Sequence, residues 1–118
     1  MGWQAVNVEH ACHYCVPAHT GIAKSMKVRD DLIEELRNDE TLSDSKLNTL
    51  KETVLAVTRG RGNVDNAQLD AFYSAGYKHQ QLLEIILILA QKVMSNYTNH
   101  LADTPVDEPF KKFDWSPK

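Results

Sequence analysis

Apolar residues recur along the chain at helical spacing, and no stretch shows the alternating apolar and polar pattern of a half-buried strand. Leu32, Ile33 and Leu36 share one helical face, and the segment that follows contains Leu47 and Leu50 at the same period. Glycine and proline fall at the edges of these segments. The pattern predicts an all-α fold, an oligomeric bundle with helices near 3–10, 13–26, 29–38, 43–59, 65–75 and 78–102.

Several residues are typical of helix ends. Ser43 is a candidate N-cap for the fourth helix. Asp65 and Gln68 have the spacing of a capping box, and Gly76 suits the residue just after a helix. Pro17 stands early in the second helix, where its missing N–H is least harmful.

The last predicted helix contains the most apolar run of the chain, residues 82–90. Because this run is apolar on nearly every face, we expect it to be buried on most sides, either in the core or between subunits. Glu84 lies inside the run and would then need a buried hydrogen-bonding partner. We also expect Met26 and Met94 to fill the core.

The chain changes character after position 102. It becomes polar and proline-punctuated, yet it carries Phe110, Phe113 and Trp115. Aromatic side chains in such a segment are expected to lie on a surface. We therefore predict a helical domain over 1–102 and an aromatic C-terminal tail over 103–118 that packs on this domain or on a neighbouring subunit.

Composition and charge argue against several classes of function. The 118 residues suit one domain, and domains of this size gain stability from association. Thirteen basic against sixteen acidic residues give a net charge of −3, which argues against a nucleic-acid partner. The apolar run is far shorter than the ~20 residues that span a membrane, and the start does not resemble a secretory signal. We expect a cytoplasmic, reducing location.

The two cysteines carry the candidate chemistry. Cys12 and Cys15 are three residues apart, and His19 follows Cys15 by four, which places thiol and imidazole on one helical face. A helix N-terminus lowers the pKa of nearby thiols and populates the nucleophilic thiolate. A thiolate attacks peroxides or disulfides, and a second cysteine returns the oxidised sulfur to a disulfide. The imidazole spacing favours Cys15 as the activated thiolate, and the helix terminus favours Cys12.

Other interpretations of these residues remain open. Cys12, Cys15 and His19 could bind zinc together with His10 or His13, although structural zinc usually joins two separate chain segments. The cysteines could also be inert core residues. Attached c-type haem is excluded, because the histidine would have to follow Cys15 directly. No cofactor is implied.

The run CHYCVPAHT, residues 12–20, resembles the signature of the alkylhydroperoxidase D branch of the carboxymuconolactone decarboxylase family. The segment from Glu84 to His100 and the tail are also similar to members of that branch. The resemblance implies an all-α fold, trimers or hexamers, and paired cysteines that act as a peroxidase or disulfide-reductase centre. It disfavours lactone decarboxylation, which belongs to a branch without this pair.

Carried over by position, the resemblance makes Cys12 and Cys15 the redox pair and His19 the proton-relay histidine. The family's relay glutamate would stand about twelve residues before the first cysteine, just before Met1, which favours a truncated or late-started version of a longer protein. Glu9 is too close to Cys12 to be that residue. Tyr14 stands where founding members carry histidine.

These observations predict an antioxidant enzyme that reduces a peroxide or a partner's disulfide and is regenerated by a lipoyl or peroxiredoxin-type thiol donor. The alternative is a non-catalytic helical interaction module. His100, with Asn96 and Asn99 within one turn of it, could line the site or a subunit contact.

Overall fold

The computed structural model describes residues 1–117, and its regular structure there is entirely helical. The elements are α1 (Gly2–Glu9), α2 (Cys15–Ser25), α3 (Asp30–Arg37), α4 (Ser45–Arg59), α5 (Asn66–Ser74), α6 (His79–Ala102) and the 3-10 helix η1 (Glu108–Phe113). The prediction of an all-α fold is confirmed. Helix bounds differ from the predicted ones by a residue or two, most clearly at α2, which begins at Cys15.

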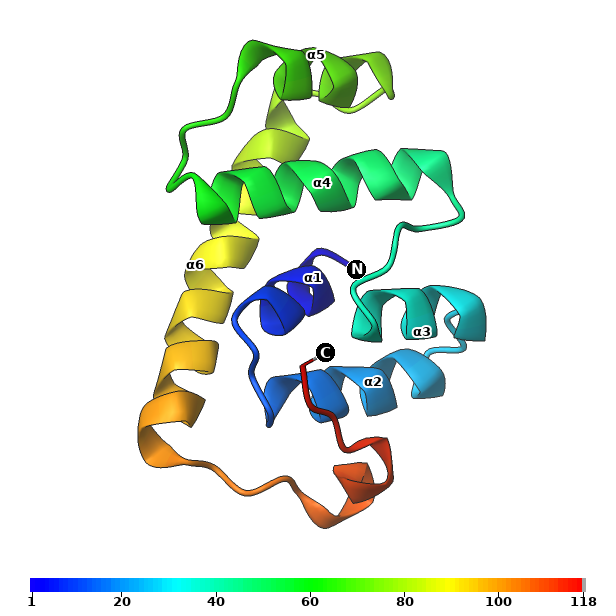
Figure 1. Cartoon of the computed structure of the whole chain (residues 1–118), viewed down its shortest axis with the longest axis vertical. Coiled ribbons are helices and arrows are strands. Elements are labelled where there is room, and N and C mark those ends of the chain that lie inside the picture. The colour runs from blue at the N-terminus through cyan, green and yellow to red at the C-terminus, as the bar shows by residue number, and fades with distance from the viewer. Residues whose placement is uncertain (118) are drawn as a thin grey trace.

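Helix α1 lies at the centre of the molecule and packs against α2, α3, α4 and α6 (Figure 1). Its short sequence supplies Ala5 and Val6 to the main core, where they meet Val54 of α4, Phe72 of α5 and Ile85 of α6. Each of these side chains is at most 2% exposed. Burying a large apolar side chain stabilises a fold by about 1.5–3 kcal/mol. Because the side chains of α4, α5 and α6 in this core pack around α1, the short central helix joins these helices.

Local signals explain several helix ends. The Asp65 carboxylate accepts a hydrogen bond from the Gln68 backbone N–H, as predicted, although the Gln68 side chain donates to Thr53 instead of returning to Asp65. Gly76 follows α5 with a φ of +102°, a conformation that favours glycine. The N-cap of α4 is Asp44 and not Ser43.

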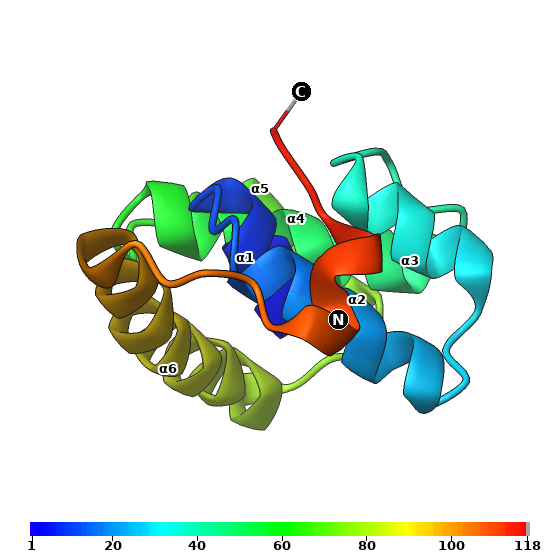
Figure 2. The ribbon, with the colours of Figure 1, turned by 90° about the horizontal axis from the view of Figure 1, so that it is seen from below.

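The C-terminal tail crosses from the end of α6 to α2, where η1 lies against the helix (Figure 2). A Cβ atom on Gly21 would come within 2.5 Å of the Phe110 ring, so only glycine allows this close approach. Arg37 donates to the carbonyls of Phe113 and Asp114 at 2.8 and 3.0 Å. Trp115 donates back to the Arg37 carbonyl at 2.8 Å. Lys118, the last residue of the predicted tail, lies outside the described residues.

The 82–90 run is not buried in the core, so the first of its two predicted environments is wrong, whereas burial between subunits stays a prediction. Within the run only Ile85 is buried, whereas Leu83 is 68% and Leu87 is 58% exposed. Glu84 is exposed and accepts a hydrogen bond from Gln80 one turn earlier, so it needs no buried partner. One face of α6 suffices for packing, because the helix lies at the side of the molecule (Figure 1).

The two methionines expected in the core are also at the surface. Met26 is 71% and Met94 is 73% exposed. Met26 is the C-cap residue of α2, and Met94 faces outward from α6. The spacing of the two methionines is compatible with the buried or the exposed face of a helix, so the sequence pattern does not show which face carries them.

Candidate active site

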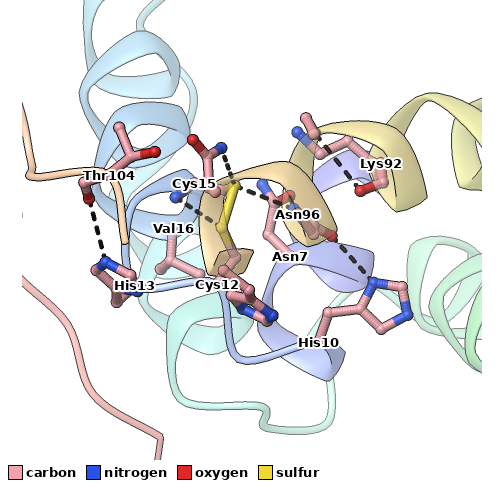
Figure 3. The surroundings of a disulfide bond; sticks show 12 residues. Asn7, His10, Cys12, His13, Cys15, Val16, Lys92, Asn96 and Thr104 are labelled. Carbon is pink, nitrogen blue, oxygen red and sulfur yellow. Dashed lines mark hydrogen bonds between the residues drawn. A yellow bond between two sulfur atoms is a disulfide. The ribbon is translucent and has the colours of Figure 1, made fainter. Parts of the chain in front are cut away.

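The two cysteines lie in the turn between α1 and α2. Ala11 adopts a left-handed φ of +52°, and the chain then returns so that the Cys12 N–H donates to the Asn7 carbonyl at 3.0 Å. Cys12 and Cys15 form a disulfide with Cα atoms 5.2 Å apart (Figure 3). Because Cys15 is the first residue of α2, both sulfurs lie at a helix end that favours negative charge.

Both sulfurs receive hydrogen bonds from N–H groups. The Cys15 backbone N–H donates to Cys12 Sγ at 3.2 Å. Asn96 Nδ2 and Asn99 Nδ2, both on α6, donate to Cys15 Sγ at 3.0 and 3.4 Å. Cys12 is 0% and Cys15 is 3% exposed. Donors of this kind stabilise the negative charge that a sulfur gains when the disulfide is reduced.

His19 lies one helical turn after Cys15, and it is paired with Lys92 of α6. Lys92 Nζ lies 3.1 Å from His19 Nε2, and the Trp3 ring packs edge-on at 5.9 Å. Burial, and then the positive charge of Lys92, lowers the pKa of His19 to about 4, so the ring is neutral near pH 7. Because an ammonium group only donates, the ring proton resides on Nδ1.

Burial also lowers the pKa of Lys92, whose side chain is almost completely enclosed. Among residues 1–117, the hydrogen bonds connect His19 to Lys92 and not to a cysteine sulfur. His19 also lines a pocket of about 240 Å³ between α1, α2 and α3, whose walls are otherwise apolar except for Gln4 and Thr20. The imidazole thus lies between Lys92 and an apolar cavity.

The three histidines near the cysteine turn have separate partners. His10 Nδ1 lies 3.0 Å from Asn96 Oδ1, whereas His13 Nε2 donates to the Thr104 carbonyl of the tail at 3.1 Å (Figure 3). His100 is exposed, and its Nε2 lies 3.3 Å from the Ala11 carbonyl. Tyr14 O–H donates to Asp107 of the tail at 2.7 Å. The residues between the two cysteines therefore hold the tail.

The zinc alternative gains no support from this arrangement. Within residues 1–117, no three histidine, cysteine, aspartate or glutamate side chains are grouped so as to bind a metal ion. His13 in particular turns away to the tail.

Sequence spacing predicts that Cys12 and Cys15 form a pair, but it does not predict two features of their surroundings. Spacing relates Asn96 and Asn99 only to His100, and no pattern in the sequence marks Lys92. Both asparagines approach Cys15 from more than eighty positions along the chain. The one available signal was a polar residue on the inward face of an otherwise apolar helix.

Comparison with protein families and with curated proteins finds no match for the sequence. Among solved structures, the chain is similar to the crystal structure of an uncharacterized peroxidase-related protein from Silicibacter sp. TM1040. The TM-score is 0.81 at 17% sequence identity, and the likeness covers 93% of this chain and 59% of that one. No helix within residues 1–117 is long and apolar enough to cross a membrane.

The structural likeness gives the fold alone. The chain has the fold of a peroxidase-related helical protein and spans less than two thirds of that protein's length.

Proposed function

We propose that the chain is a thiol-dependent oxidoreductase that reduces a peroxide or a partner's disulfide through Cys12 and Cys15. The observation that carries this proposal is their disulfide at the start of α2, with N–H donors on both sulfurs. The fold shared with a peroxidase-related protein agrees with it. The resemblance of residues 12–20 to the alkylhydroperoxidase D signature supports the same assignment.

In the peroxidase direction, the Cys15 thiolate attacks one oxygen of the peroxide. The O–O bond breaks, Cys15 becomes a sulfenic acid, and the alkoxide that leaves takes up a proton. The Cys12 thiolate then attacks the sulfenic sulfur, which releases hydroxide and forms the Cys12–Cys15 disulfide. A dithiol donor of the lipoyl or peroxiredoxin type returns the pair to thiols by exchange.

His19 is the proposed proton relay, and we assign its proton source to Lys92. A proton received at Nε2 from the Lys92 ammonium group, 3.1 Å away, allows Nδ1 to release its own proton to the alkoxide. The lowered pKa of His19 suits this role, since a neutral ring has a free site to receive the proton. Lys92 thus supplies the exchangeable proton that the family resemblance ascribes to an upstream glutamate.

We also propose that the protein is a homo-oligomer, a trimer or hexamer, in the reducing cytoplasm, where thiol donors are available. An exposed face of α6 supports the assembly. Its residues are Leu83, Leu87, Ala90, Met94, Tyr97 and Leu101, here named the α6 stripe. They follow one another at alternating intervals of four and three, the spacing of helices that pack against helices. Continuous apolar surface of this kind typically marks a protein interface.

The decisive experiment follows loss of an organic hydroperoxide with dihydrolipoamide as reductant. We expect Cys12→Ser and Cys15→Ser each to abolish turnover, because either change prevents the disulfide from forming. His19→Ala should slow turnover by roughly 10², the effect of removing a general acid or base. Undiminished peroxide reduction by the Cys15→Ser protein would refute the assignment and leave the non-catalytic interaction module.

A further inference from the structure

The two sulfurs of the disulfide have unequal surroundings. Cys15 Sγ accepts hydrogen bonds from two side-chain amides, whereas Cys12 Sγ accepts one from a backbone N–H. Asn96, the nearer of the two amides, is 0% exposed. Neither amide belongs to the cysteine motif, since both come from α6. The asymmetry is therefore a property of the fold and not of the motif alone.

The orientation of these amides follows from a chain of hydrogen bonds that begins at a backbone carbonyl. Gln4 Nε2 lies 3.2 Å from the Val16 carbonyl, which can only accept, so the NH₂ group of Gln4 has to face it. Gln4 Oε1 is thereby left to accept from Asn7 Nδ2 at 3.0 Å. The Asn7 carbonyl oxygen must then face α6.

The chain of hydrogen bonds continues from Asn7 to the Cys15 sulfur. Asn7 Oδ1 accepts from Asn96 Nδ2 at 2.9 Å, and the second hydrogen of that NH₂ group is available to Cys15 Sγ at 3.0 Å. Asn96 Oδ1 faces His10 Nδ1 at 3.0 Å, so that ring nitrogen carries a proton. Figure 3 shows Asn96 between the disulfide and His10. The Val16 carbonyl thus determines that a donor, and not an acceptor, faces Cys15.

Donors matter here because the site is enclosed. Removing a thiolate from water disfavours its charge, and hydrogen bonds to the charged form offset this effect. Amides do not titrate, so Asn96 and Asn99 remain donors at any pH at which the fold persists. Three histidines face the cysteine turn: His10 contacts Asn96, His13 contacts the tail, and His100 lies near Ala11. The turn also faces the carboxylates of Asp103, which lies 3.7 Å from His13, and Asp107, which accepts from the Tyr14 hydroxyl.

We infer that Asn96, assisted by Asn99, is a positioning residue that makes Cys15 the resident thiolate of the reduced pair. Cys15 is then the leaving sulfur when a dithiol donor reduces the disulfide. This inference rests on the proposed function, which it deepens by giving each sulfur a separate role. Because Cys12 is fully buried, the reaction requires local opening of the turn that carries it.

The exchange runs in two balanced steps. One thiolate of the donor forms a bond to Cys12 Sγ, the Cys12–Cys15 bond breaks, and the electron pair passes to Cys15 Sγ, where the two amides hold the negative charge. The donor's second thiol loses its proton to water and attacks the donor's own sulfur in the mixed disulfide. Cys12 leaves as a thiolate and takes a proton from water, while the donor becomes a disulfide.

The test is alkylation of the fully reduced protein by iodoacetamide across pH, with each cysteine quantified by mass spectrometry. Asn96→Leu keeps the approximate size of the side chain, removes the NH₂ donor and adds no charge beside the sulfur. Asn99→Leu removes the second donor from a half-buried position and keeps the test available if the first variant does not fold. Thr98→Ala is the matched control, on an exposed site of the same helix.

We expect Cys15 to be alkylated at lower pH than Cys12 in the wild-type protein. Asn96→Leu should raise the Cys15 midpoint by about one pH unit or more, a factor of ten in its ionisation equilibrium. Asn99→Leu should raise it by less, and Thr98→Ala should leave it unchanged. A shifted midpoint in a protein that turns over neither a peroxide nor a disulfide would support the inference while refuting the proposed function.

Two results would overturn the inference. The first is earlier alkylation of Cys12 in the wild-type protein. The second is an unchanged Cys15 midpoint in both asparagine variants, including the case in which they only lower thermal stability, because a purely structural role would affect stability alone.

Discussion

His19 illustrates how a single side chain links the stability of the fold to its chemistry. The ring is held between Trp3, Lys92 and the apolar pocket, and this setting lowers its pKa to about 4. A neutral ring with one free nitrogen can receive a proton from Lys92, as the relay requires. The same setting makes protonation of His19 unfavourable for the folded state.

We therefore expect the free energy of unfolding to decrease as pH falls from about 6.5 towards 4. In this window the unfolded chain, with the ordinary histidine pKa, binds a proton that folded His19 does not accept. Partial exposure of the ring limits the effect to about 1–2 kcal/mol. Urea unfolding at several pH values measures it.

His19→Gln should remove this share of the pH dependence, whereas His79→Gln, at an exposed position, should retain it. Equal pH slopes for the wild-type and His19→Gln proteins would contradict the account.

For single residues, sequence spacing sufficed to predict that Cys12 and Cys15 lie together, because a short motif at a helix start depends on neighbouring residues alone. It did not reveal Lys92 or the role of Asn96. Their contacts join α6 to α1 and α2, and such contacts exist only once the helices have packed. A helical period shows which residues share a face, but not which residue on a distant helix meets them.

Among the elements, the tail is distinguished by its attachment to α2 and α3. Arg37 donates to Thr20 of α2 and to two carbonyls of the tail, so one guanidinium group joins three segments. Tyr14 and His13, inside the cysteine motif, hold the tail at a second place. The tail thus contacts the turn that carries the two cysteines.

Arg37→Met should destabilise the protein by about 1–3 kcal/mol, because it removes hydrogen bonds from a charged donor to partly buried acceptors. Amide hydrogen exchange should accelerate in residues 108–115. Arg29→Met is the control, since the exposed Arg29–Asp31 pair contributes little. Unchanged exchange in the tail of the Arg37 variant would show that other contacts hold it.

Helix ends were predictable where one residue carries the signal, as at Asp65 and Gly76. Helix ends were harder to predict where two candidate N-cap residues are adjacent. Ser43 and Asp44 are both good caps, and Asp44 occupies the N-cap because Ser43 bonds to Glu35 of α3. Helix η1 was not predicted, since its position depends on packing against α2 and not on a period of its own.

For the whole molecule, the α6 stripe is the main feature that one chain leaves unexplained. Helical patterning correctly identified an unusually apolar helix, but only one side of it contacts the core. The chain also spans 59% of the peroxidase-related structure it resembles. The remaining apolar face, from Leu83 to Leu101, is available for the proposed contact between copies.

A charge placed in the α6 stripe should weaken this assembly. We expect Leu87→Glu and Met94→Glu each to lower the molar mass measured by analytical ultracentrifugation, because burying an unpaired carboxylate between subunits is unfavourable. Ala71→Glu adds the same charge to an exposed site on α5 and should leave the mass unchanged. A monomeric wild-type protein would contradict the proposal.

The most direct test of the central claim is a single-turnover titration. The fully reduced protein is mixed with less than one equivalent of an organic hydroperoxide, and thiols, peroxide and disulfide are counted. We expect two thiols to be lost and one Cys12–Cys15 disulfide to form for each peroxide consumed. Peroxide that survives contact with the reduced protein, or disappears without loss of the paired thiols, would contradict it.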